Sequence, residues 1–473
     1  MKSKTLFKLI FFIFLLTTIN AQDTSKEKEE SLSDYDEKLS VIKYGLGDDI
    51  LELIKQLQND EDTRFDSDLQ TLFSETKIPA VREALFSHFA FNKNEILKPD
   101  ALMILENRYD YPKDTVRAAI FYIKEIKITE ASENLKTMLK EDAQDFDEAS
   151  IAAFAKIGTP EDAVFLSEFF ENATFEDEKH TLIIKQNIMF ALEELHYSEN
   201  RDFFKRIVED EDENSIIRGT AVSALGKVGN EEDIAVLTAI FEDKDPFLRA
   251  SALKGLAGFK TNEAKNVLLQ GFKDSYYKVR LQAIKSAKEE KWTEAVPYIL
   301  YRAKKDTEAV VKNAAIEALS ELNDTEANTW LIESFTSEKT GISLKYKIAE
   351  FLLKNNFGLI YSEFEKEALK VIEDPKKKQI CIEFGKIISK IENDLTVSVA
   401  QAYLNHKDTV IKSLGLDMFK KNKYSQLIPI VTSIAQDKKS GALGRRAKNI
   451  LEAAGIQVNN EKAGNSLPAA SSN

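Results

Sequence analysis

Apolar residues recur along most of the chain at the three- and four-residue spacing that marks one face of an α-helix. The first clear example is Ile50, Leu53, Ile54 and Leu57, which follows a turn at Gly45–Gly47. Similar short segments succeed one another to about Ile456, and Gly- or Pro-containing turns separate them. The pattern predicts many short amphipathic helices, none of which buries its apolar face alone.

Residues 212–323 show that these helices belong to a repeat. An acidic residue stands six positions before a basic one four times: Asp212 and Arg218, Asp243 and Arg249, Asp274 and Arg280, Asp306 and Lys312. The basic positions are 31, 31 and 32 residues apart, and each is followed three residues later by Ala. A fixed period of this size indicates stacked helix pairs, in which each pair buries its apolar faces against its neighbours.

The same position can be followed over most of the chain. The equivalents of Arg218 are Arg82, Arg117, Asp147, Lys185, Arg249, Arg280, Lys312, Lys345, Lys377, Lys412 and Arg446. A chain of 473 residues is too long for one compact core, and no Gly/Ser/Pro-rich linker divides its middle. We therefore expect an all-α fold, a right-handed type of α-solenoid or superhelix of about twelve helix pairs with polar caps, over residues 39–456.

The residues of the repeat resemble those of a known family. Asp-x5-Arg is followed by an Ala-rich helix that ends in LeuGlyLysValGly at Leu225–Gly229, and Ala155–Gly158 repeats this ending. The pattern resembles the short HEAT repeat of phycobilin-lyase-like proteins, and the chain is similar to exported HEAT-repeat proteins of Gram-negative bacteria such as spirochaetes. The resemblance implies a curved solenoid with the second helices on its concave face. It also implies that Asp and Arg form a ladder between repeats.

The N-terminus has the pattern of a secretory signal peptide. Lys2, Lys4 and Lys8 precede or enter a short apolar run that ends before Ala21, and this run is too short to span a membrane. We expect a signal peptide over residues 1–21, a disordered charged leader over 22–38 and a disordered tail over 457–473. The mature protein is then periplasmic or secreted, with no transmembrane segment.

Candidate catalytic chemistry is sparse. None of His88, His180, His196 and His406 has a second histidine within one helical turn, so the spacing does not predict a metal site. Cys381, the single cysteine, stands between two isoleucines and is interpreted as a buried apolar residue. Phosphate-binding glycine loops and nucleophile motifs do not occur. The sequence therefore predicts no enzyme, no metal and no cofactor.

The charge distribution bears on partners. Residues 22–270 carry 30 basic and 53 acidic side chains, whereas residues 271–473 carry 32 and 26. An acidic first half and export both argue against a nucleic-acid partner. The opposite signs of the two halves leave two interpretations open: head-to-tail self-association, and solvated helix faces that differ only in composition.

Two interpretations also exist for the charged repeat. Arg218, Arg249 and Arg280 either line a groove for an acidic peptide or pair with the recurring aspartates, and the shared phase favours the structural ladder. Helical geometry instead nominates the position five residues after the basic one as an exposed face, namely Tyr122, Phe190, Lys254 and Lys285. Trp292 and Trp330 are expected to pack between repeats.

These observations favour a non-catalytic scaffold of the bacterial cell envelope that binds a protein partner. The alternative is a lyase-like or small-ligand-binding HEAT-repeat protein with an aromatic cleft near Phe190 and Tyr122. Large exposed aromatic side chains often anchor protein partners, and extended repeat surfaces suit such partners better than catalysis.

Overall fold

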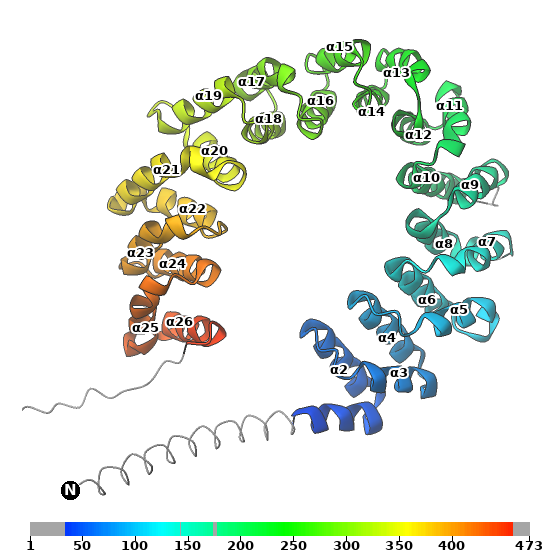
Figure 1. Cartoon of the computed structure of the whole chain (residues 1–473), viewed down its shortest axis with the longest axis horizontal. Coiled ribbons are helices and arrows are strands. Elements are labelled where there is room, and N and C mark those ends of the chain that lie inside the picture. The colour runs from blue at the N-terminus through cyan, green and yellow to red at the C-terminus, as the bar shows by residue number, and fades with distance from the viewer. Residues whose placement is uncertain (1–33, 142, 174–176, 457–473) are drawn as a thin grey trace, which may run out of the picture. The chain divides into compact units, whose positions relative to one another are not determined.

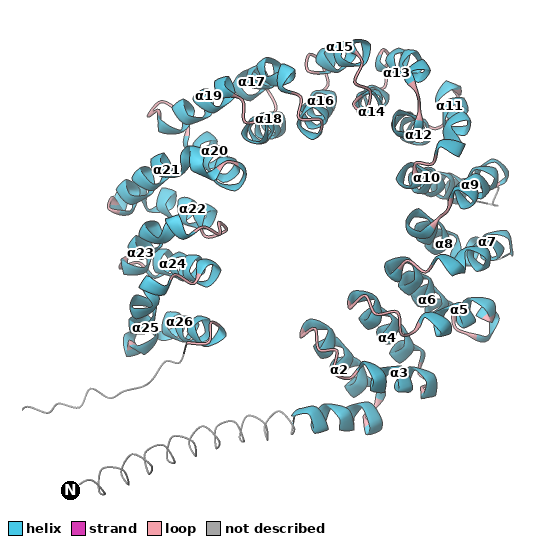
Figure 2. Cartoon of the chain, viewed as in Figure 1, coloured by secondary structure: helices cyan, strands magenta, loops and turns pink. Residues whose placement is uncertain are grey.

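The computed structural model describes residues 34–141, 143–173 and 177–456, and all the regular structure there is helical (Figure 2). The predicted signal peptide and C-terminal tail lie outside the described residues, as does most of the predicted leader. Residues 34–38, predicted as part of the leader, instead begin a helix that covers residues 34–44. Gly45 separates this helix from the next one, and the Asp49 carboxylate accepts a hydrogen bond from the Leu46 N–H at 3.1 Å.

The described part of the chain divides into two compact units, the first ending at Asp233 and the second beginning at Ile234. The first contains α2 (Gly47–Asn59), α3 (Asp66–Glu75), α4 (Pro79–Phe91), α5 (Lys98–Glu106), α6 (Lys113–Ile126), α7 (Ser132–Glu141), α8 (Ala143–Ile157), α9 (Pro160–Asn172), α10 (Glu178–Leu195), α11 (Arg201–Glu209) and α12 (Ser215–Val228). The second contains α13 (Ile234–Phe241), α14 (Pro246–Leu256), α15 (Asn262–Gly271), α16 (Tyr277–Glu289), α17 (Val296–Lys305), α18 (Ala309–Leu322), α19 (Thr325–Thr336), α20 (Ile342–Asn355), α21 (Phe357–Ile372), α22 (Lys378–Ile388), α23 (Val397–Asn405), α24 (Thr409–Asn422), α25 (Ile428–Gln436) and α26 (Gly441–Ala453). Short 3₁₀ helices precede several of them, including η4 (Glu231–Asp233) and η6 (Pro375–Lys377).

Within each unit the helices are arranged in two rows (Figure 1). Each even-numbered helix packs against the odd-numbered helix before it and against the even-numbered helices on either side in its unit. The basic positions of the repeat lie on the even-numbered helices α4 to α26, except for Lys377, which lies in η6 just before α22. The all-α solenoid of helix pairs predicted from the period is therefore confirmed.

Small residues allow the even-numbered helices to approach closely. Ala221, Ala252, Ala283 and Ala315, which follow the repeat's basic residue by three positions, are all buried. A small residue is also needed where α24 meets the odd-numbered helix before it, because a Cβ atom built at Gly415 would lie 2.7 Å from the backbone nitrogen of Leu404 on α23. Close contact of this kind lets each helix bury an apolar stripe on its neighbours. Within the described residues, no helix is both long and apolar enough to cross a membrane.

Candidate functional site

The charged repeat forms a ladder of ion pairs within the second unit. Arg249 on α14 donates from Nε to Asp274 Oδ2 at 2.8 Å and from Nη2 to Asp274 Oδ1 at 3.0 Å. Its Nη1 donates to the carbonyl oxygens of Asp243 and Lys244, at 3.0 and 3.1 Å. The arginine therefore binds the side chain of the next repeat's aspartate and the backbone of its own turn.

Arg280 on α16 repeats this geometry with Asp306. Both Nε–Oδ2 and Nη2–Oδ1 distances are 2.7 Å, and Nη1 donates to the carbonyls of Asp274 and Ser275. Burial disfavours the charged carboxylate of Asp306, but hydrogen bonds from Arg280 and from the Glu308 N–H outweigh this and lower its pKa to about 2. The pKa of Asp274 is lowered in the same way by Arg249, against its own burial.

Of the remaining predicted members of the ladder, Asp212 and Lys312 do not repeat this geometry. Arg218 is nearly buried and donates from Nε to the carbonyl of Val208 at 2.8 Å. Asp212 is exposed, and its carboxylate makes no ion pair within the described residues. Lys312 also makes none there, because the chain has Ser337 and Glu338 where an aspartate equivalent to Asp306 would be expected.

A second set of buried aspartates was not predicted. Asp233 accepts two hydrogen bonds from Arg201, at 2.8 Å from Nε and 3.0 Å from Nη2, and its Oδ2 accepts one from the Asn230 N–H. Asp162 accepts from Lys136 Nζ at 2.7 Å and from the Thr159 N–H. Both aspartates stand four residues after the glycine that ends an even-numbered helix. This Gly-x-x-x-Asp spacing was the available sequence signal, and it marks a capping residue that also binds the preceding repeat.

The predicted partner face needs one correction. Tyr122 is fully buried: its hydroxyl donates to the Asn94 carbonyl at 2.7 Å and accepts from the Leu97 N–H at 3.2 Å. The prediction that it is exposed was wrong because the repeat of α6 is offset by one residue. The buried residues Ala119, Ile120, Tyr122 and Ile123 correspond to Ile188, Met189, Ala191 and Leu192 of α10.

With this offset, Phe121 takes the exposed position on α6 that Phe190 has on α10. Phe121 is 42% exposed and Phe190 is 49% exposed. Ala152 is the exposed residue at the same position of α8, which packs between them. Lys254 and Lys285 are also exposed, and Lys285 lies 3.8 Å from Glu289 in an ion pair within α16.

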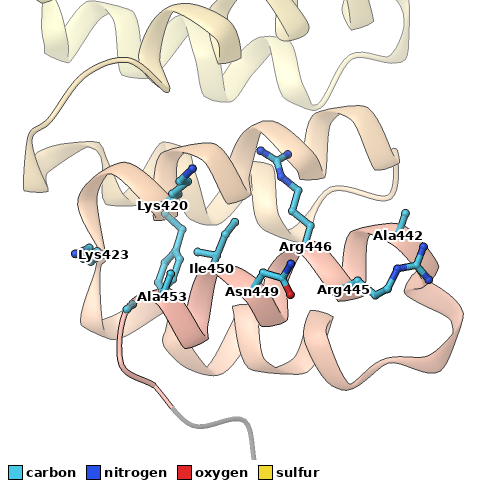
Figure 3. A pocket seen from close by; sticks show the side chains of 10 residues that line it. Lys420, Lys423, Ala442, Arg445, Arg446, Asn449, Ile450 and Ala453 are labelled. Atoms are coloured by element: carbon cyan, nitrogen blue, oxygen red, sulfur yellow. The ribbon is translucent and has the colours of Figure 1, made fainter. Parts of the chain in front are cut away.

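One cavity lies beside the last two even-numbered helices, α24 and α26 (Figure 3). It measures about 650 Å³, and its lining includes Lys420, Lys423 and Arg445. Arg446, at its edge, is already bound to Asp417 and to the hydroxyl of Ser413. Arg446 therefore helps to hold α26 against α24 and is not free to bind a ligand.

A second cavity, of about 630 Å³, has Cys381 and His406 in its lining. Burial raises the pKa of the Cys381 thiol, which disfavours the reactive thiolate. His406 Nδ1 accepts the Asp408 N–H at 3.0 Å and so helps to form a turn. No group of three or more His, Cys, Asp or Glu side chains within the described ranges has the arrangement of a metal site.

An aromatic cleft is present, but it lies in the second unit and not near Tyr122. It measures about 410 Å³ and is lined by Phe272, Lys273, Pro297, Tyr298, Tyr301 and Arg302, between α15 and α17. Of these three cavities, the cleft in the odd-numbered row has the most aromatic lining. Sequence reasoning missed it because no single repeat position collects these residues.

The helix pairs, their period and the Asp–Arg ladder define an α-solenoid of the HEAT-repeat class. A family model described as Spirochaete HEAT repeat protein matches residues 42–450, and the chain belongs to this family. The resemblance to HEAT-repeat proteins stated from the sequence is therefore confirmed. Among curated proteins, no match was found.

Several solved structures are similar to this chain at low identity and low TM-score. The complex of CpcE and CpcF of phycocyanin lyase from Nostoc sp. PCC7120 is 16% identical, with 62% of this chain and 94% of that chain covered and a TM-score of 0.28. Kap121p is 12% identical, with 85% of this chain but 51% of that chain covered and a TM-score of 0.37. An engineered protein is 13% identical, with 83% and 99% covered and a TM-score of 0.30.

Proposed function

We propose that this protein is a non-catalytic scaffold of the bacterial cell envelope that binds another protein. The observation that carries the proposal is the pair of exposed phenylalanines, Phe121 and Phe190, at equivalent positions of α6 and α10. Large apolar side chains held on a rigid surface are frequent anchors of protein interfaces. A folded chain gains nothing from exposing two such rings in register, whereas a partner that covers them gains apolar burial.

The spacing of the two rings also suits a protein partner. Ala152 lies between them, so a partner meets a small residue flanked by two large ones. Two interhelical spacings of 8–10 Å separate α6 from α10, which puts the two rings about 20 Å apart. A partner helix or strand of ordinary length reaches both, while a small ligand does not.

The envelope location rests on the N-terminal sequence. Lys2, Lys4 and Lys8, the short apolar run and Ala21 form a secretory signal pattern. The proposal therefore concerns the mature chain after residue 21, acting in the periplasm or outside the cell.

Site-specific photocrosslinking tests this proposal. Benzoylphenylalanine replaces Phe121 in one variant and Phe190 in another, and irradiation of intact cells is followed by mass spectrometry. We expect one and the same envelope protein at both positions, and none at Glu168, an exposed position on α9. Absence of any shared adduct at the two positions would overturn the proposal, as would an enzymatic turnover lost when a single surface carboxylate is neutralised.

A further inference from the structure

Cations and aromatic rings alternate along three successive odd-numbered helices of the second unit. Lys273, after α15, lies 5.7 Å from the ring centre of Tyr298; Arg302 lies 4.8 Å from that of Tyr301; and Lys304 lies 5.4 Å from that of Trp330 on α19. We call these six residues the cation–aromatic strip. Trp330, which was expected to be packed between repeats, is only half-buried here.

The strip borders the aromatic cleft between α15 and α17. The rings of Phe272 and Tyr298 lie 5.7 Å apart and are tilted by 33°, and Pro297 lies at the rim. Tyr301 is 57% exposed. A cleft of about 410 Å³ with aromatic walls is large enough to accept a proline together with a neighbouring apolar side chain.

The cations of the strip are poorly neutralised by the protein. Lys273 and Lys304 make no ion pair within the described ranges, and Arg302 shares Asp306 with Arg280 at the long distance of 3.3 Å. A cation next to a ring is not by itself informative, since the first unit also has such pairs.

In the described part of the first unit some of these pairs are neutralised by a carboxylate, whereas others, such as Lys140 with Phe165 and Lys185 with Phe170, are not. Lys136 lies 5.9 Å from the Phe165 ring but is bound to Asp162 at 2.7 Å. Arg206 lies 5.5 Å from the Phe203 ring but is bound to Glu171 at 2.6 Å. The two units also differ in charge. Residues 22–233 contain 49 acidic and 25 basic residues, whereas residues 234–473 contain 30 acidic and 37 basic residues. The strip is therefore a positive and aromatic surface with little neutralisation by carboxylates, in the unit that has an excess of basic residues.

We propose that the cation–aromatic strip binds an acidic, extended segment of a partner protein. The inference rests on the proposed scaffold function and assigns a second contact surface to it. Carboxylates of the segment bind Lys273 and Lys304, while a proline or other apolar residue inserts beside Tyr298 and Tyr301. Aromatic rings and arginine at a partly dry site are the residues that dominate binding energy in protein interfaces.

Selection from a phage-displayed library of random twelve-residue peptides tests the assignment on the full mature chain. Peptides are kept if they bind the native protein and lose at least about tenfold in affinity on Tyr301→Ala and on Lys304→Glu, a loss of about 1.4 kcal/mol. We expect these strip-dependent peptides to be rich in Asp and Glu around a Pro, Leu or aromatic residue, and their binding to weaken as NaCl rises.

Lys376→Glu is the matched control, because Lys376 is exposed in η6 and its substitution changes the net charge as Lys304→Glu does. This variant should bind the selected peptides within about twofold of the native protein, since distant exposed charges are screened by salt. A selection that yields no strip-dependent peptides, or basic or uncharged ones, overturns the assignment.

Two further probes separate other occupants from an acidic peptide. A fluorescent twenty-residue oligo-dT that binds in a strip-dependent manner, more tightly than the peptides, would point to nucleic acid and overturn the inference. Strip-dependent dimerisation in analytical ultracentrifugation would assign the surface to a second copy of the chain and also overturn it. Crosslinks at Phe121 and Phe190 are independent of all these results, so the scaffold proposal can stand if the strip assignment fails.

Discussion

Arg280 and Asp306 form a two-point ion pair that ties the start of α16 to the turn before α18. Both nitrogen–oxygen distances are 2.7 Å, and the Asp306 side chain is fully inaccessible to solvent. The same guanidinium also binds two backbone carbonyls of its own turn. One side chain therefore fixes the spacing of two repeats, and its loss leaves both a buried carboxylate and two carbonyls without a strong partner.

We predict that Arg280→Ala destabilises the second unit by about 3 kcal/mol, the lower end of the cost of breaking a buried ion pair. The lower end applies because Arg302 still lies 3.3 Å from Asp306. Arg280→Lys should recover little of the stability lost in Arg280→Ala, since an ammonium group cannot reproduce the two parallel hydrogen bonds. Urea unfolding of the mature chain followed by far-UV circular dichroism measures the change.

Lys312→Ala is the matched control, because Lys312 occupies the same repeat position on α18 without an ion pair in the described part of the chain. Its effect should stay within about 0.5 kcal/mol, as for other surface substitutions. If Arg280→Ala and Lys312→Ala lowered the free energy of unfolding equally, the assignment of the ladder as a stabilising element would be wrong.

The ladder also predicts a dependence of stability on pH. Asp306 has a pKa of about 2 in the folded protein, below the ordinary value of 3.8. A carboxyl group with a lowered pKa stabilises the fold above its unfolded pKa, and this stabilisation is lost as the pH falls through the folded value. The difference in unfolding free energy between the native protein and Asp306→Asn should be constant above about pH 5 and shrink between pH 4 and pH 2. A difference that stays unchanged down to pH 2 would show that folding does not lower the pKa of Asp306.

The fold could be predicted from the sequence because solenoids are built by a local rule. The 31- and 32-residue spacing of Arg218, Arg249, Arg280 and Lys312 specifies a helix pair, and stacking then follows from the apolar faces. The prediction was weakest where this rule is locally broken. At α6 the period is offset by one residue, so the basic residue Arg117 does not mark the same helical face as Lys185 does on α10.

The candidate surfaces were harder to predict because they combine positions from different repeats. The cation–aromatic strip brings together Lys273, Tyr301 and Trp330, which share no common repeat position. Their proximity depends on how α15, α17 and α19 pack, and on which lysines find carboxylates. The sequence shows the second half to be basic, but it does not show which cations remain without an ion pair.

Neighbouring residues on α6 offer a direct test of the offset. Tyr122→Ala should destabilise the first unit by about 3–5 kcal/mol, as for large aromatic truncations in a core. Phe121→Ala should lower the free energy of unfolding by less than about 1 kcal/mol, because the ring is already 42% exposed. The same substitution should abolish crosslinking of the partner at position 190. Thermal unfolding of the two variants and photocrosslinking in the Phe121→Ala background give the two measurements. If Phe121→Ala were the more destabilising change, the offset assignment would be wrong.

The packing of α24 against α23 leads to the last prediction. Gly415 on α24 has no room for a side chain, since its Cβ would lie 2.7 Å from the Leu404 backbone nitrogen and 3.0 Å from the Tyr403 carbonyl carbon. Backbone atoms cannot rotate away as a side chain can, so α23 and α24 must separate. We expect Gly415→Ala to destabilise the second unit by about 1–3 kcal/mol, as for other overpacked sites, although alanine favours helix formation by about 0.5–1 kcal/mol over glycine.

Gly358→Ala on α21 is the control, because its Cβ meets nothing within 4 Å, and there the helix preference alone should leave the protein equally or more stable. Urea unfolding of both variants distinguishes the two sites, and a neutral Gly415→Ala would show that α23 and α24 separate at little cost.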